Sequence, residues 1–304
     1  MIVLSGGTGT PKLLRGLKNV IPEEDITVIV NTAEDRWVSG NLVCPDIDTV
    51  LYTFAGIIDE RKWWGIKNDT FHAHETLKKL GYHESMKLGD QDRTTHIVRA
   101  ELIRNDHTLT EATERLRSSL GVKARVLPMT NDPVATMVDT PNSKMHFQDF
   151  WIAHKGEPDV LDVKFDDMDT AEPTPEVIEA LSSENTIVIG PSNPITSIGP
   201  ILGLEGVIPI LQKKHVIAIS PIIGNKPVSG PAGKLMRAKG YEVSSAGVAQ
   251  CYEDFLDVLV VDRRDNCVLP NIEIVKTNTM MSSVERSMEL ARFIVGLVRS
   301  PKDN

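Results

Sequence analysis

The chain has 304 residues, a formal net charge of −9, and 41% apolar and 25% charged residues. These proportions are those of an ordinary globular protein, so they exclude a disordered chain and suit a single α/β domain over residues 1–304. The acidic balance argues against a general binder of nucleic acid or anionic membranes, and three widely spaced cysteines indicate a reducing compartment. No stretch approaches the ~20 apolar residues of a membrane span, so we expect a cytoplasmic protein.

The amino-terminal segment predicts a buried strand at residues 2–4, a glycine-rich loop, and a helix with Pro11 in its first turn. The candidate phosphate ligands of this segment are Gly6, Gly7, Thr8, Gly9, Thr10 and Lys12. Glycine lets backbone N–H groups approach a ligand, and a helix N-terminus carries partial positive charge, so the turn suits a phosphate. The spacing matches neither the dinucleotide fingerprint nor the P-loop, and a turn that needs glycine only for packing is the alternative.

Two aspartates, Asp46 and Asp48, lie near the start of a predicted helix, beyond a predicted strand at residues 26–30. At a helix start, both carboxylates could reach one cation or one polar ligand. Mg²⁺ is held by one or two carboxylates together with phosphate oxygens, so the pair predicts a Mg²⁺ site facing the phosphate loop. The alternative is that Asp46 is an N-cap and Asp48 a first-turn acid favoured by the helix dipole.

Residues 59–121 have a helical pattern without clear buried strands, which predicts a helical insertion able to serve as a lid over a bound substrate. Its helices are expected at residues 69–80, 92–104 and 109–120, the first of them opened by a cap signal at Asp69. We interpret all eight histidines as structural. Trp63 and Trp64 are expected to fill a core rather than to stack on a flat ligand.

Beyond the insertion, strand and helix signals alternate, which predicts an α/β fold with a mainly parallel sheet. Strands are expected at residues 123–129, 185–189, 215–220, 256–261 and 272–275, a hairpin at 134–138 and 145–153, and helices at 174–181 and 282–298. A second loop follows the strand at 185–189, and its candidate ligand residues are Gly190, Ser192, Asn193 and Ser197. The alternative is a turn whose helix breakers serve the topology alone.

Four motifs, in this order along the chain, resemble those of the 2-phospho-L-lactate transferases of deazaflavin coenzyme F-420 biosynthesis. They are residues 6–9 with 12–16, residues 45–53, residues 87–92 with Thr95 and His96, and residues 190–194 with 197–198. The resemblance covers nearly the whole chain. It implies a Rossmann-like three-layer α/β sandwich, and usually a homodimer.

The resemblance also implies a reaction. A phospholactyl group, or a related phospho-acid group, would move from a guanosine diphosphate-linked donor, lactyl-2-diphospho-5′-guanosine, to a deazaflavin acceptor. The acceptor group would be the ribityl hydroxyl of 7,8-didemethyl-8-hydroxy-5-deazariboflavin. The implied cofactor is Mg²⁺, and the released product is GMP.

Individual site roles follow from the same resemblance. It implies that Asp48 and Lys87 contact the deazaflavin, that Asp46 accompanies Asp48 in metal or hydroxyl contact, and that the two glycine loops cradle the guanosine diphosphate. Members of the family often have arginine at the position of Lys87, and lysine keeps the charge but loses the bidentate fork. Asp48 is the candidate for orienting or deprotonating the attacking hydroxyl, and both roles stay open.

Two other functions are considered for a chain with this opening loop, and the sequence disfavours both. The leading alternative is a non-catalytic regulator of a related family that binds a nucleotide sugar or a dinucleotide. Such relatives typically begin their second loop with Gly-Pro-Gly-Ser and lack the Asp-Ile-Asp-Thr-Val sequence, whereas this chain has Gly190-Pro-Ser-Asn and both aspartates. A nicotinamide dehydrogenase is disfavoured because the G-x-G-x-x-G spacing and a suitably placed acid are missing.

Overall fold

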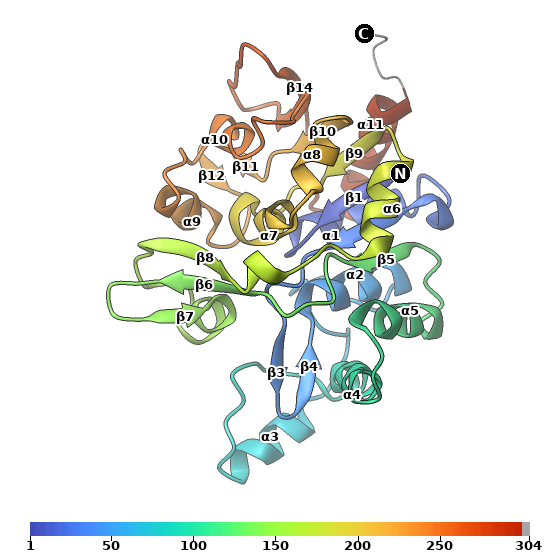
Figure 1. Cartoon of the computed structure of the whole chain (residues 1–304), viewed down its shortest axis with the longest axis vertical. Helices are drawn as coiled ribbons and strands as arrows, with labels where there is room; N and C mark the ends of the chain where they lie inside the picture. Colours follow the sequence, from blue (N-terminus) through green and yellow to red (C-terminus); the bar gives the residue numbers. More distant parts are fainter. Residues whose placement is uncertain (300–304) are drawn as a thin grey trace.

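A seven-stranded parallel β-sheet forms the centre of the protein (Figure 1). The computed structural model describes residues 1–299, and the strand order in the main sheet is β14-β13-β10-β9-β1-β2-β5, with every neighbouring pair parallel. The strands are β1 (Ile2–Ser5), β2 (Thr27–Val30), β5 (Arg125–Pro128), β9 (Thr186–Ile189), β10 (His215–Ile219), β13 (Val258–Asp262) and β14 (Glu273–Thr277). All seven were predicted, most of them because parallel strands covered on both faces are continuous apolar runs.

Helices cover both faces of the sheet, so the predicted three-layer α/β sandwich is confirmed. One outer layer contains α1 (Gly9–Leu17), α2 (Pro45–Ala55), α5 (Leu109–Ser119) and α11 (Val284–Arg299). The other contains α6 (Pro175–Ser183), α7 (Gly199–Gly203), α8 (Val207–Leu211), α9 (Ala232–Ala238) and α10 (Ser245–Gln250). Successive strand residues face opposite layers, so Val3 packs with α1 and α11 while Leu4 packs with α6 and α8.

The loops after β1 and β9 start from neighbouring strands, because β1 pairs directly with β9. From β1 the chain builds the sheet toward β2 and β5, and from β9 it builds toward β10, β13 and β14 on the opposite side. The connections on the two sides of this switch point diverge, which leaves a crevice at the carboxyl ends of the strands. Both predicted glycine loops therefore open into the same crevice.

Residues 59–121 form α3 (His72–Lys79), α4 (Asp90–Arg104) and α5. Helix α4 packs against a hairpin of β3 (Arg36–Val38) and β4 (Asn41–Val43), which the sequence did not predict. This hairpin, α3 and α4 extend away from the sheet at the bottom of Figure 1. Three-residue strands are too short to give a clear alternation of apolar and polar residues, which explains why the hairpin was missed.

Helices α3 and α4 are capped by each other's leading aspartates. Asp69 accepts hydrogen bonds of 2.9 Å from two backbone N–H groups at the start of α4. Asp90 accepts two bonds of the same length from the first backbone N–H groups of α3. The prediction that Asp69 opens the helix at 69–80 is therefore wrong: α3 begins at His72, and Asp69 caps the helix that follows it.

A smaller antiparallel sheet of β6 (Ala135–Asp139), β7 (Lys144–His146) and β8 (Asp162–Asp166) flanks the main one. The hairpin of β6 and β7 was predicted, but its second strand ends at His146 rather than continuing to residue 153. The chain turns instead into a π-helix at Asp149–Ala153. Phe147 and Phe150 are both buried, and their spacing of three residues fits a helical turn rather than a strand.

The remaining elements are short. They are 3₁₀ turns at Glu23–Asp25 and Met168–Thr170, a π-helix at Pro194–Ile198, and the two-residue strands β11 (Ile222–Ile223) and β12 (Lys226–Pro227). Between residues 1 and 299, the structure contains no helix with both the length and the apolar character that a membrane crossing requires.

Candidate active site

The two glycine loops interlock at the crevice. A Cβ atom on Gly9 would lie 1.8 Å from a backbone carbonyl oxygen of the second loop, and one on Gly190 would lie 2.1 Å from the hydroxyl of Thr10. The backbone N–H of Thr10 donates to the Ser192 hydroxyl over 3.1 Å, and the two hydroxyls are 2.7 Å apart. Ser192 also donates to the carbonyl of Gly6. Gly6, Thr10 and Gly190 therefore join the loops and do not line the cavity beside them.

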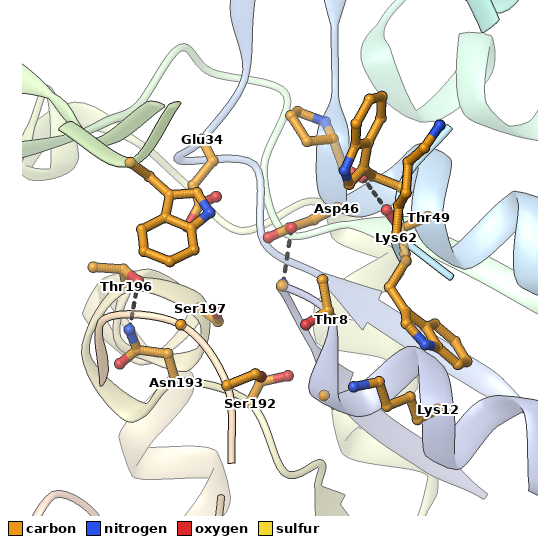
Figure 2. Close-up of a pocket in the computed structure, with 18 of the residues that line it drawn as sticks. Thr8, Lys12, Glu34, Asp46, Thr49, Lys62, Ser192, Asn193, Thr196 and Ser197 are labelled. Carbon is orange, nitrogen blue, oxygen red and sulfur yellow. Dashed lines mark hydrogen bonds between the residues drawn. The ribbon is translucent and has the colours of Figure 1, made fainter. Parts of the chain in front are cut away.

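That cavity has a volume of about 800 Å³ and lies at the carboxyl ends of the strands (Figure 2). The other candidate residues all line it: Gly7, Thr8, Gly9, Lys12, Asp46, Asp48, Lys87, Ser192, Asn193 and Ser197. Figure 2 shows Thr8, on the first loop, and Lys12, in the first turn of α1, on the side of the cavity opposite Ser192 and Asn193 of the second loop. Four further segments complete the walls, at residues 61–65, 147–152, 228–232 and 279–282.

Asp46 is held by neutral groups. One of its carboxylate oxygens accepts the backbone N–H of Gly7 at 2.8 Å, and the other accepts the side-chain amide of Asn31 at 2.9 Å. Burial raises the pKa of Asp46 to about 6, although both hydrogen bonds act in the opposite direction. The proposal of Asp46 as an N-cap is wrong, because Cys44 occupies the cap of α2 and the carboxylate of Asp46 reaches the glycine loop instead.

Glu34, which the sequence did not mark, lies on the same side of the cavity as Asp46 (Figure 2). It accepts a hydrogen bond of 2.9 Å from the side-chain amide of Gln148. Its pKa is raised well above the ordinary value, first by burial and then by the negative charges of Asp46 and Asp35. This side of the cavity thus carries carboxylates whose negative charge is not neutralised, and their hard oxygen atoms suit Mg²⁺.

Asp48 belongs to a different network, formed with α4. Arg99 Nη1 lies 3.1 Å from Asp48 Oδ2, Arg99 Nη2 donates to the other oxygen, and His96 Nε2 lies 3.2 Å from Oδ2. Although burial alone would raise the pKa of Asp48, the charges and hydrogen bonds of Arg99 and His96 lower it below the ordinary value. Asp46 and Asp48 therefore have different protein partners, although both line the same cavity, and that both reach one ligand stays a prediction.

His96 connects Asp48 to a second acid. Its Nε2 lies 3.4 Å from Asp92 Oδ1, and the Tyr52 hydroxyl donates to the same oxygen at 2.8 Å. Burial lowers the pKa of His96, but the two aspartates outweigh it and raise the pKa to about 9. His96 also lines the cavity, a position that the interpretation of every histidine as structural did not anticipate.

The set of Asp48, Asp92 and His96 places one ligand atom from each residue within 4.8 Å of the others, an arrangement compatible with a divalent metal. Two features make it a poor site for Mg²⁺. One ligand is a ring nitrogen, which Mg²⁺ disfavours, and the guanidinium of Arg99 already neutralises Asp48. Asp46 and Glu34, by contrast, offer carboxylate oxygens alone, the ligand type that Mg²⁺ prefers.

Cations and aromatic rings form the rim on the insertion side. Lys12 Nζ lies 5.3 Å from the ring centroid of Trp63, and Lys87 Nζ lies 4.4 Å from that of Phe71. Trp64 is 41% exposed. The expectation that Trp63 and Trp64 fill a core is wrong, because both line the cavity, where they can contact a flat ligand.

Some of the site residues that the sequence analysis did not single out do have a recognisable pattern in the sequence. Asp92, His96 and Arg99 follow one another at spacings of four and three residues, which places them on one face of a helix. Glu34 and Gln148 left none, because they lie 114 residues apart, Glu34 in a turn and Gln148 at the start of the π-helix.

Comparison with known proteins accounts for almost the full length of the chain. The family described as 2-phospho-L-lactate transferase CofD matches residues 1–289. The chain belongs to the CofD family. This assignment confirms the resemblance read from the four motifs, and the CofD chain is accordingly a transferase of coenzyme F-420 biosynthesis rather than a non-catalytic regulator.

Curated relatives of this CofD chain carry the same description. A 2-phospho-L-lactate transferase from Methanosarcina acetivorans is 57% identical, covering 98% of both chains. One from Methanosarcina mazei is 56% identical over 97% of this chain and 99% of the relative, and one from Methanocaldococcus jannaschii is 47% identical over 96% of both.

A solved structure supports the fold of the CofD chain. A UPF0052 family member from Bacillus halodurans superimposes with a TM-score of 0.67, covering 97% of this chain and 98% of that one. Its sequence is 17% identical, so the similarity extends to the fold alone.

Proposed function

We propose that the chain transfers the phospholactyl group of lactyl-2-diphospho-5′-guanosine to the ribityl hydroxyl of 7,8-didemethyl-8-hydroxy-5-deazariboflavin, releasing GMP. The observation that carries the proposal is the division of one cavity into two chemically different sides. Interlocked glycine loops with Asp46 form one side, and Asp48, Lys87 and aromatic rings form the other. A volume of about 800 Å³ lies in the range of sites that enclose cofactor-sized ligands.

The diphosphate of the donor belongs against the glycine loops. Gly7 has a φ of +55°, a left-handed conformation that an L-residue rarely adopts, and its lack of a side chain leaves room for a phosphate. Lys12 supplies a positive charge, and Thr8, Ser192 and Ser197 supply hydroxyl groups at the same wall. On this wall the guanosine diphosphate moiety would therefore contact hydrogen-bond donors and a positive charge. The first carboxylate that it would meet is that of Asp46.

Asp46 and Glu34 are the residues that would hold Mg²⁺. When bound, the ion would neutralise charge on the diphosphate as the leaving group departs. The raised pKa values of these two acids mean that their ionised forms are disfavoured without a cation, and a diphosphate beside them would disfavour ionisation further. A divalent ion on this side would therefore balance the negative charge of both the two acids and the diphosphate of the donor.

On the other side, Asp48 orients the attacking hydroxyl and Lys87 contacts the acceptor. The acceptor oxygen bonds to the phosphorus that carries the lactyl group, and the bond from that phosphorus to the bridging oxygen breaks. The bond's electron pair stays on the phosphate of GMP, and the hydroxyl proton passes to water or to that phosphate. In-line placement and charge neutralisation supply most of the catalysis in such transfers.

The test is incubation of the purified chain with deazaflavin acceptor, guanylylated phospholactate and Mg²⁺, with GMP and the coupled product measured by chromatography. We expect stoichiometric release of GMP, and GDP should bind more tightly than ADP in calorimetry. The phosphoenolpyruvyl donor, run in parallel, reports which phospho-acid is preferred. Equal affinity for ADP and GDP, or no GMP release with either donor, would contradict the proposal.

Gly7→Val should abolish most GDP binding, because the side chain fills the phosphate space and strains the backbone. Gly81→Val is the matched control: Gly81 has a φ of +81° but is exposed and open on all sides. That variant has the same kind of strain without touching the cavity, so it should bind GDP as the wild type does.

We also propose that the chain forms a homodimer in the cytoplasm, and sedimentation analysis tests the dimer.

A further inference from the structure

Arg99 is a buried charge that the reaction as described does not use. It lies on α4 with 0% exposure, and its guanidinium binds both carboxylate oxygens of Asp48 and the backbone carbonyl of Leu42. Its Nε atom has no hydrogen-bond partner between residues 1 and 299. Asp48 is thus the acid that the guanidinium of Arg99 contacts, and Asp48 lines the cavity.

Stability alone does not account for this pair. A buried ion pair gains little over well-packed apolar residues of similar volume, because both charges lose their hydration. What the pair supplies is geometry: two parallel N–H donors fix the plane of a carboxylate in a way that a point charge cannot. His96 is a third donor to the Asp48 carboxylate, at Oδ2. Asp92 in turn binds His96, and the Tyr52 hydroxyl donates to Asp92, so both hold His96 in place.

We propose that Arg99 is a positioning residue of the transfer reaction, which holds the Asp48 carboxylate in one orientation on the acceptor side of the cavity. In that orientation Asp48 accepts the hydrogen bond of the acceptor hydroxyl and aligns its oxygen with the donor phosphorus. The proposal rests on the proposed function, and it settles the open role of Asp48 as a positioner. A carboxylate that already shares its lone pairs with three donors is poorly suited to take a proton as well.

The test compares Arg99→Lys with wild type in steady-state kinetics, varying acceptor and donor separately. Lysine keeps the positive charge but loses the fork. We expect kcat to fall by roughly tenfold or more, the size of effect that misplacement of a reacting group produces, with the donor KM changed less than about twofold. Donor affinity in calorimetry should match wild type, which shows that the loop side is intact.

Arg93→Lys is the matched control. Arg93 lies on the same helix and also binds a carboxylate with both ends of its fork, that of Glu84, outside the cavity. This control should keep both kinetic constants near wild type. If Arg99→Lys does not fold, Tyr52→Phe replaces it. This variant removes the hydroxyl that donates to Asp92, so Asp92 holds His96 less firmly. We expect kcat to fall severalfold without a change in donor KM.

Three results would overturn the positioning role. The first is wild-type kcat in Arg99→Lys or Tyr52→Phe. The second is an equal loss in donor affinity and kcat, which would indicate general damage to the fold. The third is a kcat loss in Arg93→Lys as large as that in Arg99→Lys. Absence of GMP release from the wild-type chain would instead overturn the proposed function itself, and the two failures are distinguished in the same assay.

Discussion

The two sides of the cavity place the same type of residue in opposite electrostatic surroundings. Asp46 and Asp48 are two residues apart in the first turn of α2, and both are nearly inaccessible to solvent. Asp46 meets neutral N–H donors and the acid Glu34, so its negative charge lacks a counterion. Asp48 meets Arg99 and His96, so its charge is balanced within the protein. Under the proposed function, the loop side would receive a cation and the insertion side would hold a carboxylate in one orientation.

The sharpest test of this difference is the pair Asp48→Asn and Asp46→Asn. Asp48→Asn leaves Arg99 buried without a counterion, so the free energy of unfolding should fall by about 3–5 kcal/mol, and kcat by about a hundredfold or more. Denaturant unfolding and steady-state kinetics measure the two effects.

Asp46→Asn is the companion variant, and it should change the unfolding free energy by less than about 1 kcal/mol, because it removes a buried charge that has no counterion. Its kcat should also fall, with partial recovery at high Mg²⁺. Similar stability losses in the two variants would mean that the two sides do not differ as described.

The pH dependence of stability sharpens the same comparison on the insertion side. The pKa of His96 is raised to about 9 from an ordinary value of 6.5, since Asp48 and Asp92 outweigh the effect of burial. A raised histidine pKa stabilises the fold fully below pH 6.5, and this stabilisation is lost as the pH rises through about 9. The free energy of unfolding of wild type should therefore exceed that of His96→Gln by at most about 3 kcal/mol at pH 6. This difference should disappear near pH 9.5.

Unfolding curves of both proteins at pH 6, 7.5 and 9.5 measure that gap. His107→Gln, at an exposed histidine outside the cavity, is the control and should differ little from wild type at each pH. A gap between wild type and His96→Gln that is constant from pH 6 to 9.5 would show that His96 is not charged in the folded protein.

The smallest expected effect concerns Lys87, on the acceptor rim. Lys87→Ala should raise the acceptor KM about tenfold, corresponding to ~1.4 kcal/mol, and leave the donor KM unchanged. Lys87→Arg should keep most activity, because a charge over Phe71 is retained. Lys79→Ala, an exposed lysine on α3, is the control for loss of one positive charge. An acceptor KM that does not respond to Lys87→Ala would remove Lys87 from the acceptor site.

Much of this molecule could be predicted from local sequence. The seven main strands are apolar runs of the length that a parallel sheet requires, and the glycine loops stand directly after two of them. What local sequence cannot reveal is which distant groups converge. Asp48 meets Arg99 across 51 residues, and nothing near Asp48 distinguishes it from Asp46. For the same reason, glycines expected to bind phosphate turned out in part to make room for the other loop, as Gly190 does for Thr10.

The central position of β1 has a consequence for how the chain is made. β1 is synthesised before the other six strands of the main sheet, and β2 can pair with one of its edges as soon as residues 27–30 follow. The other edge belongs to β9, so it stays without its partner until residues 186–189 have been synthesised. An apolar strand with an open edge invites pairing with other chains. Nascent chains should therefore depend on chaperones over most of translation, and truncations that end before β9 should aggregate.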